Sequence, residues 1–213
     1  MNLILFGPPG AGKGTQAQFI VKQHNYFQLS TGDLLRNEVN QKTKLGVEIE
    51  KLISKGKFVS DKIVNKLLRQ SILNLKFRDR IIFDGYPRNV GQAKNLEVIL
   101  GEFNQTIGHI IFLNVSRNII EKRIMGRMTC EKCHMTMNEF FNKDQIDLHP
   151  CGKEFLVKRK DDNLDVVIAR FDTYMKSTKP VLDFYSKNRN FIEIDGAGEI
   201  DQITRKINDI LKV

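Results

Sequence analysis

The residues from Gly7 to Thr15 have the composition of a phosphate-binding loop. They read Gly-Pro-Pro-Gly-Ala-Gly-Lys-Gly-Thr, directly after an apolar run and before a segment with helical spacing. Glycines let several backbone N–H groups point inward at an anion, and a helix N-terminus adds partial positive charge. The usual pattern has Ser or Thr directly after the lysine, whereas here Gly14 stands in that place and Thr15 follows. Lys13 is expected to reach the terminal phosphates from a cradle formed by Gly10, Ala11, Gly12, Gly14 and Thr15.

Arginines and one aspartate elsewhere in the chain suit the same chemistry. Phosphoryl transfer needs positioned phosphates and neutralised charge more than it needs covalent work by the protein. A planar guanidinium holds phosphate through two hydrogen bonds. Asp84 ends the apolar run Ile81–Phe83, a position suited to holding Mg²⁺ through water, although a turn residue before Gly85 could look the same. The phosphate charge could be balanced by Lys13 together with Arg36, Arg88, Arg123, Arg127, Arg159 and Arg170.

The three cysteines of the chain fall within one short stretch. A secreted disulfide framework would be even in number and dispersed, so a reducing cytoplasm and a metal site are favoured. Cys130 and Cys133 have the spacing of a zinc knuckle, and Cys151-Gly152-Lys153-Glu154 mirrors that spacing with Glu in the fourth place. We expect a structural Zn²⁺ held by Cys130, Cys133, Cys151 and Glu154. His149 and His134 are alternative fourth ligands, and loss of the metal with free thiols is the other interpretation.

The elements that must position these residues alternate between two kinds. Apolar runs of strand type lie at Leu3–Phe6, Phe27–Leu29, Ile81–Phe83, Ile110–Val115 and Phe191–Ile194. Segments with helical spacing lie between and after them, as at Ile200, Ile203, Ile207 and Ile210. Strands that are apolar on both sides, alternating with helices, predict a parallel sheet covered on both faces. We therefore predict a doubly wound α/β fold with five parallel strands.

Two stretches interrupt this alternation. About fifty residues separate the second strand from the third, which is more than one crossover helix requires. Between Arg127 and Lys160 the strong periodicity disappears, and the cysteines lie there. Both stretches are interpreted as insertions at the edge of the sheet where ligands bind.

Composition limits the class of partner. The 213 residues include 34 basic and 25 acidic ones, a net charge of +9 that suits nucleic acid, phosphate-bearing molecules or an acidic membrane surface. A solvated basic surface would give the same balance. The aromatic residues do not interleave with basic ones as in a nucleic-acid stacking platform. No run reaches the length of a signal-peptide core or a membrane span, so a soluble cytoplasmic protein is expected, with neither nucleic acid nor membrane as partner.

Five motifs in order resemble the adenylate kinase family, in its bacterial form with a long lid. They are the loop Gly7–Gln16, the run Ser30-Thr31-Gly32-Asp33-Leu34-Leu35-Arg36, the run Asp84-Gly85-Tyr86-Pro87-Arg88, the pair Arg123 and Arg127, and Arg159-Lys160-Asp161-Asp162 with Arg170. The resemblance covers the whole chain. It implies a P-loop fold and a reversible, Mg²⁺-dependent transfer from ATP to AMP that gives two ADP. It also favours a monomer.

The resemblance assigns the insertions and the nucleotide contacts. Residues 30–59 would form an AMP-binding flap and 126–162 a lid over ATP, on a core of 1–29, 60–125 and 163–213. Thr31 would face the AMP base and Arg36 its phosphate, and the other AMP contacts would be Lys57, Phe58, Val59, Gly85, Arg88, Gln92, Arg159 and Arg170. ATP would contact the loop, Arg127, Thr136, Met137 and Gly198. Three of these motifs also have a purely structural interpretation, as follows.

Ser30 and Asp33 match a helix capping box, Gly198 could be a turn, and Met137 could be plain packing. The competing functions are a kinase for another nucleoside monophosphate or with GTP as donor, a nucleic-acid-binding protein, and a P-loop switch protein. Thr31 disfavours a UMP/CMP kinase, because similar enzymes for those substrates commonly have Ala there. A switch protein is disfavoured because no base-reading Asn-Lys-x-Asp sequence is present.

Overall fold

The main sheet consists of five parallel strands. The structure is a computed structural model that describes residues 1–74, 79–141, 143–159 and 162–212. The strands are β1 (Asn2–Phe6), β2 (Phe27–Ser30), β3 (Ile81–Asp84), β4 (Ile107–Asn114) and β8 (Phe191–Asp195), in the order β2-β3-β1-β4-β8. In the register, Ile4 of the central strand pairs with Phe83 of β3 and with Ile110 of β4. The predicted five-stranded parallel sheet is confirmed.

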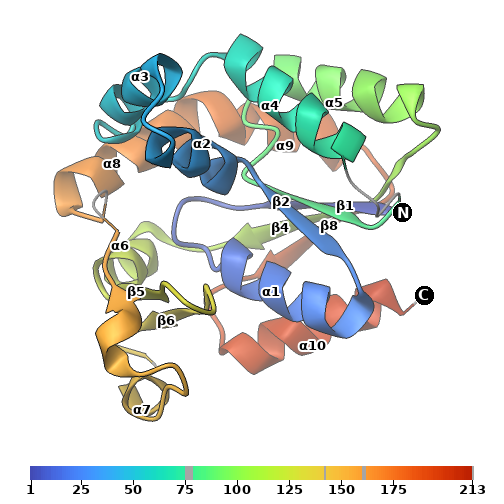
Figure 1. Ribbon diagram of the computed structural model, residues 1–213. Helices are drawn as coiled ribbons and strands as arrows, with labels where there is room; N and C mark the ends of the chain where they lie inside the picture. The colour runs from blue at the N-terminus through green and yellow to red at the C-terminus, as the bar shows by residue number, and fades with distance from the viewer. Residues whose placement is uncertain (75–78, 142, 160–161, 213) are drawn as a thin grey trace.

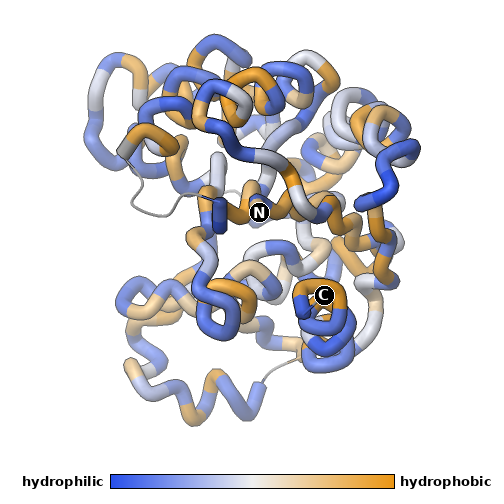
Figure 2. The backbone as a smooth tube through the Cα atoms, turned by 90° about the vertical axis from the view of Figure 1, so that its right-hand side faces the viewer, coloured by the Kyte–Doolittle hydropathy of each residue, from blue (hydrophilic) through white to orange (hydrophobic). Residues whose placement is uncertain are grey.

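Helices cover both faces of this sheet (Figure 1). α1 (Lys13–His24) and α10 (Ile200–Leu211) lie on one face, and α4 (Asp61–Asn74), α5 (Val90–Glu102) and α9 (Lys179–Ser186) lie on the other. Alternate residues of β1 enter two separate cores. Ile4 and Phe6 pack with the α4, α5 and α9 side, whereas Leu3 and Leu5 pack with the α1 and α10 side. Because both faces are buried, the strands are uniformly apolar, and the tube in Figure 2 is orange along the middle of the molecule.

The long stretch between β2 and α4 contains two helices, α2 (Thr31–Asn40) and α3 (Lys44–Ile53). The Ser30 hydroxyl accepts the backbone N–H of Asp33 at 3.2 Å, so the predicted cap at this helix start is confirmed. Thr43 caps α3 in the same way through Gly46. A Cβ on Gly46 would stand 2.3 Å from the carbonyl oxygen of Glu38, so only glycine allows the two helices to approach this closely.

A second, three-stranded antiparallel sheet lies apart from the main one (Figure 1). Its strands are β5 (Arg127–Cys130), β6 (Thr136–Asn138) and β7 (Leu156–Val157), in the order β6-β5-β7. The short helix α7 (Lys143–Asp147) and the 3-10 turn η1 (Lys153–Phe155) lie between β6 and β7. Its own core consists of Cys130, Met137 and Leu156. These strands have two to four residues each, which explains why the sequence shows no clear periodicity here.

The remaining helices connect the two sheets. α6 (Arg117–Met125) leads into β5, and α8 (Leu164–Thr173) leads back through the π-helical turn η2 (Tyr174–Thr178) into α9. The strand predicted at Ile110–Val115 begins earlier than expected, at Ile107, because Gly108 and His109 interrupt the apolar run without interrupting the backbone pairing. Among the residues that the structure describes, no helix is long and apolar enough to cross a membrane.

The packing predicts a contrast between two identical changes in helices. Val181 of α9 is fully buried, whereas Val98 of α5 is 62% exposed. Val181→Ala should lower the free energy of unfolding by about 2 kcal/mol, because it removes buried methyl groups and leaves a cavity. Val98→Ala should change it by less than about 0.5 kcal/mol. Urea denaturation of both variants checks this, and equal effects would contradict the assignment of the core.

Candidate active site

The loop between β1 and α1 has the geometry of a phosphate cradle. Gly10 and Gly12 have φ angles of 81° and 93°, and Gly12 is the N-cap of α1. A Cβ on Gly10 would lie 2.8 Å from Cγ1 of Ile124, so glycine is needed for space as well as for conformation. The Lys13 ammonium donates to the carbonyl oxygens of Gly7 at 2.8 Å and Pro8 at 2.9 Å. The lysine is thus held over the loop at the start of the helix.

A single large cavity of about 1110 Å³ adjoins this loop and gathers most of the predicted site. This volume is above the usual range for a site that holds one small ligand, about 300–1,000 Å³. The lining comes from the main sheet, the α2–α3 stretch, the second sheet and the start of α10. The predicted residues that line it are Gly10, Ala11, Gly12, Lys13, Gly14, Thr15, Arg36, Lys57, Phe58, Asp84, Gly85, Arg88, Arg123, Arg127, Thr136, Met137, Arg159, Arg170 and Gly198.

Positive charge is concentrated around Lys13. Burial, together with the nearby Arg88, Arg170 and Arg127, lowers the pKa of Lys13 to about 8, whereas Asp84 opposes the shift. Burial, with Arg170 nearby, likewise lowers the pKa of Arg88 to about 10. A site that disfavours its own cations in this way is stabilised when an anion enters it. The charge pattern therefore matches a ligand with several phosphate groups.

Two carboxylates hold arginines of this cavity. Asp33 pairs with Arg36, and their interaction lowers the pKa of Asp33 although burial acts to raise it. Arg127 Nε donates to Asp162 Oδ2 at 2.8 Å, and the Asp162 side chain is only 1% exposed. Burial and the nearby Arg127 and Arg36 lower the pKa of Arg159 to about 10. Lys160 and Asp161 lie outside the described residues.

Asp84 is positioned by a residue that the sequence analysis did not identify. Gln28 Nε2 of β2 donates to Asp84 Oδ2 at 2.9 Å, and both residues line the cavity. A Cβ on Gly14 would lie 3.9 Å from the same oxygen, so Asp84 faces the start of α1. Gln28 stands in an ordinary strand and is 56 residues from its partner, so no local pattern could have revealed it. A carboxylate at this place suits Mg²⁺ held through water.

Arg123 lies at the other end of the loop. Its NH1 donates to the carbonyl oxygen of Gly196 at 2.7 Å, and NH2 lies 3.5 Å from that of Gly198. Burial lowers its pKa, and Glu199 and Asp195 oppose this. The charged groups that shift its pKa are thus different from those that shift the pKa of Lys13. Arg123 thus lines the same cavity as the other predicted arginines, and its hydrogen bonds place it beside Gly196 and Gly198.

Thr31, Val59 and Gln92 are buried behind the wall of the cavity. Thr31 Oγ1 donates to the Gly85 carbonyl oxygen at 2.8 Å, and Gln92 Oε1 accepts the Arg88 backbone N–H at 2.7 Å. Gly85 and Arg88 themselves line the cavity. Thr31 and Gln92 therefore contact the ligand-facing loop, Val59 belongs to the core of the main sheet, and none of the three is among the residues that line the cavity.

The cysteines of the second sheet form a four-membered group with a histidine. One ligand atom each from Cys130, Cys133, His149 and Cys151 lie within 4.8 Å of one another, and Cys133 Sγ is 3.6 Å from His149 Nε2. Ligand atoms on tetrahedral zinc are separated by roughly 3.8 Å, so the group fits that ion with little adjustment.

The structure groups His149, and not the expected Glu154, with the three cysteines. The chain turns at Gly152 (φ 94°) into η1, and the Glu154 side chain is exposed. Its carboxylate folds back over Gly152, where a Cβ would lie 2.4 Å from Glu154 Oε1. His149, with an exposed fraction of 7%, completes the group with the three cysteines instead. It is one of the two alternative ligands named from the sequence.

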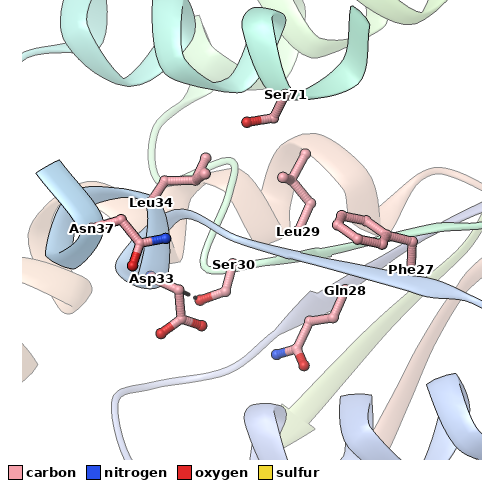
Figure 3. Close-up of a pocket in the computed structure, with 8 residues that line it drawn as sticks. All are labelled: Phe27, Gln28, Leu29, Ser30, Asp33, Leu34, Asn37 and Ser71. Carbon is pink, nitrogen blue, oxygen red and sulfur yellow. Dashed lines mark hydrogen bonds between the residues drawn. The ribbon is translucent and has the colours of Figure 1, made fainter. Parts of the chain in front are cut away.

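A second, smaller cavity of about 400 Å³ lies at the edge strand β2 (Figure 3). It is lined by Phe27, Gln28, Leu29, Ser30, Asp33, Leu34, Asn37 and Ser71. In Figure 3 the Gln28 side chain points away from Leu29, toward α1, and the dashed line is the cap between Ser30 and Asp33. The strand thus turns Gln28 toward Asp84 while Leu29 enters the core.

The fold and the cavity together define a P-loop kinase with room for two phosphate-bearing ligands. The protein-family model described as Adenylate kinase matches residues 5–190. A protein named Adenylate kinase from Pelagibacter ubique (strain HTCC1062) is 82% identical over 213 residues, which is 100% of both chains. Another of that name from Fusobacterium nucleatum subsp. nucleatum is 44% identical over 99% of this chain and 98% of its own. The chain belongs to the adenylate kinase family.

The lowered pKa of Lys13 predicts proton uptake on ATP binding. Near pH 9 the ammonium is largely neutral in the free protein, since its pKa is about 8. Bound phosphate favours the charged form and restores a higher pKa, so a proton is taken up between the free and bound values. At pH 7 and below the uptake by Lys13 should become small, because Lys13 is already largely charged there.

Isothermal titration calorimetry in buffers of different ionisation enthalpy measures this uptake. Lys13→Met should abolish it. The same uptake in that variant would assign the proton to another group.

Proposed function

We propose that this chain catalyses reversible, Mg²⁺-dependent phosphoryl transfer from ATP to AMP, giving two ADP. One observation carries the proposal: a cavity larger than one nucleotide needs, with the phosphate cradle on one side and Arg36 and Arg88 on the other. Membership in the adenylate kinase family supports the choice of substrates. In the reaction an AMP phosphate oxygen forms a bond to the γ-phosphorus of ATP, and the bond to the β,γ-bridging oxygen breaks.

The chain's own residues position and neutralise the two nucleotides. The loop amides and Lys13 would hold the ATP phosphates, and Arg36 and Arg88 the AMP phosphate. Arg127, Arg159 and Arg170 would stabilise the charge on the transferred group. Mg²⁺, when bound with ATP, would neutralise charge on the phosphates, and Asp84 would hold its water ligands in the orientation set by Gln28.

We assign Arg123 and Gly198 to the base end of the ATP site. Both lie beyond the loop from Asp84, and Arg123 is bound to the carbonyl groups of Ala11 and Gly196. Thr136 and Met137 of β6 line the same cavity from the second sheet. On the AMP side, Thr31, Val59 and Gln92 would meet the nucleotide through or beside Gly85 and Arg88.

We infer that residues 30–59 and 126–162 close over the nucleotides, on a core of 1–29, 60–125 and 163–213. The partners of Asp33 and Asp162 support this inference, because phosphates would have to replace those carboxylates at Arg36 and Arg127. Closure would also exclude water, which would otherwise hydrolyse ATP. The cavity is lined within one chain, which supports a monomer, and three free thiols suit a reducing cytoplasm.

A comparison of acceptors and variants tests the reaction. The wild type with Mg-ATP should form ADP fastest from AMP, compared with GMP, CMP and UMP. Arg88→Ala should lower kcat by roughly 10²–10³-fold, because it removes a buried cation from the phosphates.

Arg69→Ala is the matched control for Arg88→Ala. Arg69 is about half exposed and pairs with Glu102 on the surface, so this variant should keep the wild-type rate. Faster ADP formation with another monophosphate would mean that AMP is not the preferred acceptor. Absence of transfer to every monophosphate would falsify the proposed kinase activity.

We further propose that the Cys130, Cys133, His149 and Cys151 group holds a structural Zn²⁺. Three thiolates and one imidazole are ligands that zinc prefers, and four protein ligands leave no open position for catalysis. The ion would stabilise a sheet whose own core has only three buried residues. Its binding energy would contribute directly to the folding of this sheet.

Two single changes distinguish the fourth zinc ligand. Protein purified under reducing conditions should contain about one equivalent of zinc. His149→Ala should weaken zinc retention at least about tenfold against a chelator, whereas Glu154→Gln should retain the metal like the wild type. Metal analysis by mass spectrometry after dialysis gives the result. The opposite order of the two variants would make Glu154 the ligand after all.

A further inference from the structure

Asp61, the first residue of α4, connects the ends of two neighbouring helices. Both of its carboxylate oxygens accept from Asn89 Nδ2, at 3.0 and 2.9 Å, and Oδ1 also accepts from Gln92 Nε2 at 2.6 Å. Asn89 is the N-cap of α5, and its own side-chain oxygen accepts the Gln92 backbone N–H at 2.8 Å. Figure 1 shows α4 and α5 side by side on one face of the sheet.

These contacts continue into the cavity through Arg88. The other end of the Gln92 amide, Oε1, accepts the Arg88 backbone N–H at 2.7 Å. The Arg88 carbonyl oxygen accepts from Thr178 Oγ1 at 3.0 Å, and Arg88 Nε donates to Gly85. Asp61 therefore lies two hydrogen bonds from the backbone of a residue that lines the nucleotide cavity.

We propose that Asp61 is a positioning residue for the acceptor nucleotide, and that it fixes the Gln92 amide in one of its two orientations. A carboxylate only accepts hydrogen bonds and a backbone N–H only donates one. Turning the amide over would set oxygen against the Asp61 carboxylate and nitrogen against the Arg88 N–H. Gln92 is 3% exposed, so water does not readily replace either lost bond.

To a nucleotide that enters beside Gly85 and Arg88, a fixed amide would present its remaining N–H and lone pair in a single order. Adenine carries an acceptor at N1 beside a donor at N6, whereas hypoxanthine carries a donor at N1 beside an acceptor at O6. The two bases thus require opposite orientations of an amide that reads this edge. Asp61 would contribute to the preference for adenine without touching the nucleotide. This inference rests on the proposed function, in which Gln92 contacts AMP.

Asp61 also anchors the segment that carries other predicted AMP contacts. Lys57, Phe58 and Val59 lie two to four residues before it, and the Arg88 guanidinium carbon lies 5.0 Å from the centroid of the Phe58 ring. Asp61, Asn89 and Gln92 therefore connect the end of this segment and the Arg88 loop to α5. A change at Asp61 is expected to alter AMP binding more than ATP binding.

A reciprocal exchange of the two partners tests the proposal. Asp61→Asn places one amide nitrogen against the Asn89 amide nitrogen, and Asn89→Asp places two carboxylates together. In the double variant the new amide at position 61 can donate to the new carboxylate at position 89 and still accept from Gln92. The carboxylate can also keep the cap on the Gln92 N–H.

Each single variant should raise KM for AMP about tenfold and narrow the ratio of kcat/KM for AMP over IMP, with KM for ATP within about twofold of wild type. The double variant should recover most of both effects. Asp201→Asn is the matched control, because Asp201 is also an exposed acid in the first turn of a helix, α10, and should leave all three values unchanged. Thermal melting of every variant shows whether it is folded.

The results separate this inference from the proposed function. Gln92→Ala should raise KM for AMP as well. Two results would show that Asp61 is not a positioning residue even though the enzyme acts on AMP. In the first, Gln92→Ala raises KM for AMP while Asp61→Asn has no effect. In the second, the double variant has the same KM for AMP as the single variants. If the wild type does not use AMP, the proposed function fails first, and the variants then have no acceptor effect to explain.

Discussion

Burial of positive charge beside the phosphate loop is the constraint on which the rest of the structure depends. Lys13, Arg88 and Arg159 all have lowered pKa values, with burial as the largest cause. Such a cluster costs folding energy unless carboxylates or phosphates lie nearby. The protein supplies Asp84, Asp33 and Asp162 for this purpose. The phosphates of bound nucleotides would neutralise the remaining positive charge. Substrate affinity and the stability of the cavity would then depend on the same charges.

The parallel sheet makes this concentration of charge possible. The carboxyl ends of β1 and β3 lie next to each other. Asp84 is the last residue of β3, and the loop that follows β1 leads to Lys13, so both side chains lie at one edge. The α2–α3 stretch and the second sheet then add arginines from outside the core. Each of these stretches has its own helix caps or its own sheet, so they can present side chains to the cavity without altering the packing between strands.

The sequence predicted what depends on contiguous residues. The phosphate loop, the five strands and the Ser30 cap are local patterns, and the structure confirms the sheet and the cap. The expected position of Glu154 beside the cysteines differs from the structure, because spacing along the chain does not show that the backbone turns at Gly152 and removes Glu154 from the group. Gln28 and Asp61 were missed because their partners are 56 and 31 residues away. Such contacts depend on strand order and helix packing, which single-residue patterns do not contain.

The separate small core of the second sheet has a consequence for how this chain can change over evolution. Cys130, Met137 and Leu156 pack with one another and belong to neither core of the main sheet. Substitutions there alter a separately packed unit, while the two large cores stay intact. Mutational drift and adaptation to a new temperature can therefore act on the core of the second sheet first, and leave the phosphate loop between β1 and α1 unchanged.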